Sequence, residues 1–166
     1  VTSFPVPEAQ HQEQQAADFK LSTLNELSDL ADVPAPFRKK NWRGDFGSGS
    51  CVHAALISVL QYHGFSEMAE WWQNTYNDGE RFNRLEERLD GAGLRYASVY
   101  GQTDLAFLEW ACANRLPSVI GYTDDGVAQN HALTIVDLTP AHAVLIDNNS
   151  PAQYQYQYVD RAHFER

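Results

Sequence analysis

A cysteine at the junction of a glycine- and serine-rich segment and an apolar run has the clearest chemical potential in this chain. Residues 47–50 read Gly-Ser-Gly-Ser, and Cys51 leads into an apolar stretch that continues to Leu60. This pattern predicts that Cys51 begins a helix. The unpaired N–H groups and aligned peptide dipoles at a helix start favour a negative charge and lower the pKa of a thiol. Because the thiolate is the reactive form, Cys51 is a predicted nucleophile.

A base and a carboxylate for this nucleophile follow in a predicted hairpin. Residues 130–136 predict a strand that opens with His131, and residues 143–148 predict a strand that ends in Asp147 and Asn148. A tight turn makes the two strands antiparallel neighbours, so the start of one lies beside the end of the other. Asp147 can then hold the imidazole in one tautomer and stabilise its cation, with Asn148 as the fallback for that role.

The order of Cys51, His131 and Asp147 resembles that of the papain-like cysteine peptidases. Within that fold the chain resembles the bacteriocin-processing (double-glycine leader) peptidase domains and their free-standing bacterial relatives. The resemblance extends over about residues 41–164 and includes the helical segment 51–64 and both strands of the hairpin. It implies that Cys51 is the nucleophile, His131 the base and Asp147 the orienting acid of a peptidase.

The chain departs from this family pattern at the oxyanion position. The family usually carries a glutamine six residues before the nucleophile, and here Asp45 stands there. An ionised carboxylate cannot donate a hydrogen bond and would repel a developing oxyanion. Asn41 can serve as the donor if the glycine-serine segment is an insertion, and the backbone N–H of Cys51 is another donor. The family also tends to place a glycine after the cysteine, where this chain has Val52.

The elements around these residues predict an α+β fold, in which helices come first and a mostly antiparallel sheet follows. Residues 1–17 are rich in proline and glutamine and are interpreted as a flexible leader or linker, and residues 18–166 as one papain-like domain. Ser66 and Thr103 are predicted helix N-caps, and Gly64 a predicted C′ residue. The predicted helices span 18–31, 51–63, 66–76, 80–89 and 103–114, the strands 94–100, 117–122, 130–136, 143–148 and 153–159, and a helical turn 160–165.

Composition narrows the classes of function. The 166 residues carry a formal net charge of −10, which argues against binding of nucleic acid or of an anionic membrane surface. No apolar run reaches the roughly 18 residues of a membrane span. The sequence has no closely spaced metal ligands and no phosphate-binding loop, so neither a metal nor another cofactor is expected. The remaining candidates are read as structural: Cys112 as a core residue, and His53 as pointing away from Cys51 on the same helix.

The predicted activity is hydrolysis of a peptide or amide bond through a thioester on Cys51. Glutamine deamidation, cleavage of a cell-wall peptide and transfer of the acyl group to an amine use the same residues. Two alternatives remain: a catalytically weak papain-like domain that binds a peptide in its cleft, and an effector that modifies a host protein. The oligomeric state and the compartment stay open, although the polar leader and the missing initial methionine slightly favour a secreted or periplasmic protein.

Overall fold

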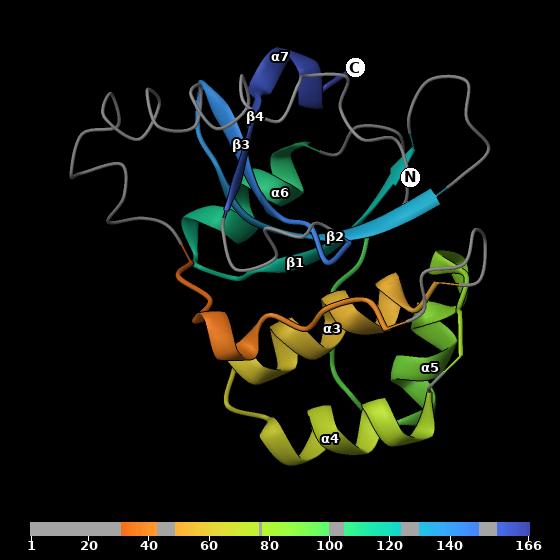
Figure 1. The fold of residues 1–166 in the computed structure, drawn as a ribbon. Coiled ribbons are helices and arrows are strands. Elements are labelled where there is room, and N and C mark those ends of the chain that lie inside the picture. The colour runs from red at the N-terminus through yellow and green to blue at the C-terminus, as the bar shows by residue number, and fades with distance from the viewer. Residues whose placement is uncertain (1–30, 43–48, 77, 100–104, 124–129, 150–155) are drawn as a thin grey trace.

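A four-stranded antiparallel sheet forms the centre of the fold, and helices pack against it (Figure 1). The computed structural model describes residues 31–42, 49–76, 78–99, 105–123, 130–149 and 156–166. The helices are α3 (Cys51–Tyr62), α4 (Ser66–Thr75), α5 (Leu85–Gly91), α6 (Leu105–Ala113) and α7 (Arg161–Phe164), with short 3-10 turns at Ala35–Phe37 and Phe82–Arg84. The strands are β1 (Ser118–Thr123), β2 (Asn130–Leu138), β3 (His142–Ile146) and β4 (Gln157–Asp160). The predicted α+β class with an antiparallel sheet is confirmed.

The strands follow one another in the order β1-β2-β3-β4, so each pairs with its neighbour in sequence. The β2–β3 pairing matches Ile135 with Leu145 and Asp137 with Val144, which leaves Val136 as the extra residue of a bulge. The carbonyl of Val136 accepts a hydrogen bond from the N–H of Ala31. The bulge therefore attaches the first described residue to the sheet.

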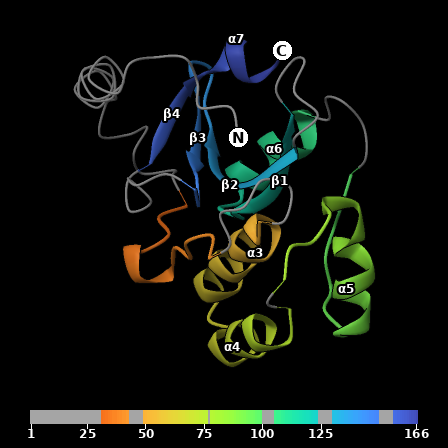
Figure 2. The same cartoon turned by 45° about the vertical axis from the view of Figure 1, so that its right-hand side comes forward.

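The two faces of the sheet pack against different helices. Ala132 belongs to a core with residues of α3, α4 and α5, whereas Leu133 and Ile135 belong to a core with Cys112 of α6. Neighbouring residues of a strand point to opposite faces, so β2 contributes to both cores in alternation. Figures 1 and 2 show α3, α4 and α5 on one side of the sheet and α6 and α7 on the other.

A third core lies near Tyr62, at the C-terminal end of α3, and includes the segment before the 3-10 turn Ala35–Phe37. Ala31 and Val33 pack there with Val144 and Ile146 of β3 and with the rings of Tyr156 and Tyr158. The two tyrosines are two residues apart, so they project to the same face of the sheet.

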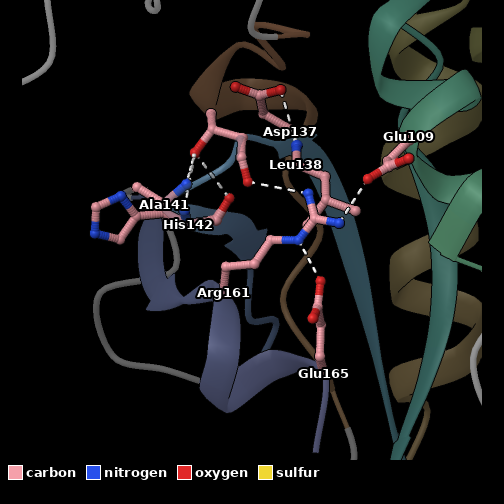
Figure 3. Close-up of polar contacts among 8 residues, drawn as sticks. Glu109, Asp137, Leu138, Ala141, His142, Arg161 and Glu165 are labelled. Carbon is pink, nitrogen blue, oxygen red and sulfur yellow. Dashed lines mark hydrogen bonds and ion pairs between the residues drawn. The ribbon is translucent and has the colours of Figure 1, made fainter.

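The C-terminal helix α7 is attached to both the hairpin turn and α6 (Figure 3). The Arg161 guanidinium donates to the carbonyl of Thr139 at 3.2 Å and to Glu109 Oε1 at 2.6 Å, and it also pairs with Glu165. The backbone N–H of Arg161 donates to the carbonyl of Ala141 at 2.8 Å. These contacts fix the end of β4, because Arg161 follows it directly.

Helices α3 and α4 form a hairpin whose turn depends on Gly64. Gly64 has a φ of +80°, a conformation that favours glycine, so the predicted C′ position is confirmed. Of the two neighbouring tryptophans, Trp72 is fully buried and Trp71 is exposed. Ser66 is not the N-cap of α4: Phe65 occupies that position, and the Ser66 hydroxyl donates to the Gln61 side chain instead.

Two predicted elements are wrong. Residues 94–99 form no strand, and residues 95–99 are exposed, so this stretch pairs with nothing in the sheet that would give it β structure. The helix predicted over 80–89 begins only at Leu85, after the 3-10 turn Phe82–Arg84, and α5 continues to Gly91. The leader at 1–17, residues 18–30 of the helix predicted over 18–31 and the N-cap Thr103 lie outside the described residues.

Candidate active site

Cys51 is the first residue of α3, and side-chain hydrogen bonds hold the chain just before it. Ser50 is fully buried, and its backbone N–H and hydroxyl both donate to Asn41 Oδ1, at 2.9 and 2.8 Å. The carbonyl of Ser50 accepts the N–H of Ala54 at 2.8 Å, which begins the helical hydrogen bonding. The prediction that Cys51 begins a helix is confirmed, and Cys51 is 9% exposed.

The base and the acid come from one end of the β2–β3 hairpin. His131 is the second residue of β2, and Asp147 directly follows the last residue of β3. His131 Nε2 lies 2.9 Å from Asp147 Oδ1, and the same oxygen accepts the N–H of Asn149 at 2.9 Å. The predicted meeting of His131 and Asp147 is therefore confirmed as geometry, and the second hydrogen bond fixes the carboxylate.

The thiol of Cys51 and the side chain of His131 lie close enough to shift each other's pKa, that of the thiol downward and that of the imidazole upward. The sulfur is also bonded by the backbone N–H groups of Ala132 and Val52. The three predicted residues thus form one continuous chain of contacts, from sulfur to imidazole to carboxylate.

The surroundings of these groups shift their pKa values in complementary directions. Burial alone would raise the pKa of Cys51, but the hydrogen bond and the charge of His131 and the N–H of Ala132 bring it below its ordinary value. Burial alone would lower the pKa of His131, but Asp147 and Cys51 raise it to about 9. Burial would likewise raise the pKa of Asp147, and the hydrogen bonds from His131 and the Asn149 N–H hold it low. These directions favour a thiolate–imidazolium pair stabilised by a carboxylate.

Asn148 is not placed to orient His131. It is 2% exposed, and its amide nitrogen donates to the carbonyls of Cys51 and Ala132, both at 3.0 Å. The alternation of β3 explains this, because Ile146 and Asn148 share the face toward α3, and Asp147 takes the opposite face. Asn148 instead ties the start of α3 to β2. Among the described residues its Oδ1 has no hydrogen-bond partner.

Asn41 connects the start of α3 to the loop after β3. Its Oδ1 accepts from Ser50, and its Nδ2 donates to Asn149 Oδ1 at 2.5 Å. Asn149 Nδ2 in turn lies 3.5 Å from His131 Nδ1. Asp45, the residue at the family's oxyanion position, lies outside the described residues. The sequence reasoning missed Asn149, although its place two residues after the predicted acid was a usable signal.

His53 takes no part in this arrangement, as the sequence indicated. It is 2% exposed, its Nδ1 accepts the indole N–H of Trp72 at 3.1 Å, and its ring stacks on Tyr76. Burial lowers the pKa of His53 and favours the neutral ring. The residue therefore belongs to the packing between α3 and α4.

The described residues were also compared with the requirements of a metal site and of a membrane-spanning helix. No group of three or more histidine, cysteine or carboxylate side chains lies close enough to hold a metal ion within the part of the chain that the structure describes. No helix there has the length and apolar character needed to cross a bilayer.

Chemically, a thiolate beside an imidazolium can attack an electrophilic carbon and then protonate the group that leaves. No protein-family model matches the chain, and neither a curated protein nor a solved structure matches it.

Proposed function

We propose that this chain is a cysteine hydrolase of the papain-like type that cleaves a peptide or amide bond through a thioester. One observation carries the proposal: His131 Nε2 lies 2.9 Å from Asp147 Oδ1, and the same ring lies close enough to the Cys51 thiol to lower its pKa. The nucleophile at the start of a helix and the base at the start of an antiparallel strand are the papain-like order, which supports this type of fold over other α+β folds.

In the first half of the reaction, the Cys51 sulfur attacks the acyl carbon of the substrate. The C–S bond forms as the carbonyl electron pair moves to oxygen. Collapse of this tetrahedral intermediate breaks the bond to the leaving nitrogen, which takes the proton of the His131 imidazolium. The products are a free amine and a thioester on Cys51. Asp147 keeps the ring in place and stabilises its cation before the proton leaves.

In the second half of the reaction, a water molecule enters the place that the released amine has left. Neutral His131 takes a proton from water, whose oxygen attacks the thioester carbon. The C–S bond then breaks, a carboxylic acid leaves, and the thiolate–imidazolium pair is restored. The oxyanion of both intermediates needs hydrogen-bond donors. The backbone N–H of Cys51, at the first position of α3, is one proposed donor, and the Asn41 amide, which is bonded to Ser50 and Asn149, is the other.

The experiment is a turnover screen with peptides and with glutamine-containing proteins, in which release of new amino termini or of ammonia is measured. The wild-type chain and Cys51→Ala are compared, and hydroxylamine is added to trap the thioester as a hydroxamate. Turnover by the wild type alone, with a hydroxamate product, supports the proposal. A rate in Cys51→Ala equal to the wild-type rate contradicts it.

The same screen separates the alternative of a peptide-binding domain. Such a domain binds a peptide, which is measurable by quenching of tryptophan fluorescence, but it forms no hydroxamate with any substrate. Binding without turnover, together with equal thiol reactivity of Cys51 and Cys112, would replace hydrolysis by recognition as the function.

A further inference from the structure

Gln157, the first residue of β4, lies beside the candidate active site and has no part in the mechanism above. Its side-chain amide is a diagonal neighbour of the Asp147 carboxylate across β3 and β4 and contributes to the low pKa of that group. The residue is half-buried, so its amide is partly withdrawn from water. Three groups of this chain therefore favour the charged form of Asp147: the His131 ring, the backbone N–H of Asn149 and the amide of Gln157.

The register of the sheet explains how Gln157 reaches Asp147. Gln157 pairs directly with Leu145, and paired residues of antiparallel strands project to the same face. Leu145 packs in the core on the α6 side, and Asp147 is two residues further along, so alternation gives it the same face. Gln157 and Asp147 are therefore diagonal neighbours, a separation that a long side chain can span.

The residue before Gln157 is held in place from the other end of the chain. The Tyr156 hydroxyl accepts the N–H of Val33 at 2.8 Å and donates to Asp32 Oδ1 at 2.7 Å. The Arg38 guanidinium lies over the Tyr156 ring, 4.1 Å from its centre. These contacts fix the entry into β4, and so the position from which the Gln157 side chain extends.

We infer that Gln157 is a positioning residue, whose amide holds the Asp147 carboxylate in the orientation that receives His131. The inference rests on the proposed function and deepens it. An amide is suited to this task because it donates a hydrogen bond without carrying a charge. A lysine or arginine at this position would pair with Asp147 and weaken its attraction for the imidazolium, whereas an amide orients the carboxylate and leaves the imidazolium as its counter-ion.

Removal of the amide narrows the pH range in which the thiolate–imidazolium pair is present, at both its acid and its alkaline limit. Without this donor the Asp147 carboxylate is less stabilised, so it takes a proton at a higher pH. A carboxylate that is poorly aligned also supports His131 less, so the ring loses its proton at a lower pH. The facing groups that titrate with Asp147 are His131 of β2 and, through the ring, Cys51 of α3.

The experiment measures the rate of Cys51 alkylation by iodoacetamide as a function of pH, since this rate needs no substrate. The variants are Gln157→Met, which keeps the length but removes the donor, and Gln157→Glu, which puts an acceptor in its place. Gln73→Met on α4 is the control, because Gln73 is half-buried and lies on a helix that carries no residue of the site. Thermal unfolding checks that each variant folds.

We expect Gln157→Met to label Cys51 more slowly near neutral pH, by about threefold to tenfold, with the pH range of fast labelling narrowed from both sides. In Gln157→Glu the added carboxylate repels Asp147, so the acid limb of the profile moves to higher pH, while its charge supports the imidazolium and the alkaline limb does not move down. The control keeps the wild-type profile. Reduced labelling at every pH with unmoved limbs, or profiles equal to that of the wild type, overturns the inference. If Gln157→Met does not fold, the isosteric Gln157→Glu decides alone. A wild type whose Cys51 reacts no faster than Cys112 contradicts the proposed function itself, which separates the two failures.

Discussion

The two cysteines of this chain lie on opposite sides of the same sheet, and their surroundings give them opposite properties. Cys51 begins α3 and is bonded by His131 and by two backbone N–H groups, which lower the pKa of its thiol despite burial. Cys112 lies on α6 in an apolar core with Leu133 and Ile135, where burial and the nearby Asp137 raise its pKa to about 12. Both are buried and neither is in a disulfide.

The comparison shows that burial alone does not determine whether a thiol is reactive. The same desolvation acts on both sulfurs, and the difference comes from the donors that face the charge. On the α3 side the ends of a helix and of two strands meet and supply such donors. On the α6 side β2 supplies the apolar side chains of Leu133 and Ile135 and the carboxylate of Asp137, which disfavours the thiolate.

The largest expected difference between the two regions is in turnover. Cys51→Ala removes the only proposed nucleophile, so turnover should fall by at least about 10³-fold. Cys112→Ala should retain the wild-type rate, because Cys112 contacts no residue of the site. The measurement is kcat/KM on a substrate found in the screen. Comparable losses in the two variants would remove the functional distinction between the cysteines.

A smaller difference is expected in chemical labelling. At pH 6, iodoacetamide should modify Cys51 at least about 100-fold faster than Cys112, since the thiolate is the reacting form. The labelling rate of Cys112 should rise about tenfold per pH unit, because its pKa of about 12 lies far above the range tested. The rate of Cys51 should rise less steeply. Peptide mass spectrometry after timed quenching measures both sites in one sample, and equal rates would contradict the assignment.

The next effect is expected from a substitution that lowers the reactivity of Cys51 and leaves both cysteines in place. Asp147→Asn removes the charge that supports the imidazolium, so Cys51 labelling near neutral pH should fall roughly tenfold while Cys112 labelling stays unchanged. In the wild type, turnover should decline as pH rises through about 9, where His131 loses its proton, and Asp147→Asn should move this decline to lower pH. Asp90→Asn on α5 is the matched control. A decline at the same pH in both variants would mean that Asp147 does not act on His131.

The smallest expected effect is on stability, and here the substitution at Cys112 should be more harmful than the one at Cys51. Cys112→Ser places a hydroxyl among apolar side chains and should lower the free energy of unfolding by about 1 kcal/mol or slightly more. Cys51→Ser should cost less, because the hydroxyl can use the hydrogen bonds that the thiol has with His131 and Ala132. Urea unfolding of both variants at one pH gives the values. A larger loss for Cys51→Ser would show that the α3 side depends on the sulfur for packing.

The sequence predicted the site better than it predicted the surrounding elements. The hairpin and the helix start carry strong local signals, which are a tight turn between two apolar runs and a change from glycine and serine to apolar residues. Once those elements are assigned, antiparallel pairing brings His131 and Asp147 to one end without further information. Their meeting with Cys51 was the step that needed a resemblance to a family.

The sequence-based predictions that failed concern features that depend on tertiary structure. The stretch 94–99 has apolar residues suited to a strand, but it pairs with no edge strand of the described sheet. Strand propensity without a partner strand does not produce β structure. The role of Asn148 was misjudged because one residue of alternation at the end of β3 decides which face its side chain takes. Gln157 gave no signal, since its contact with Asp147 depends on the register of β4.

The hydrogen bond between Val33 and Tyr156 has a consequence for kinetics. It joins residues 123 positions apart, so the loop that it closes contains most of the described fold. Closure of so long a loop is costly until the intervening chain is already ordered, and this contact should therefore form after the folding barrier. Tyr156→Phe should then leave the refolding rate nearly unchanged and accelerate unfolding, so that this contact determines the lifetime of the native state rather than the speed at which it is reached.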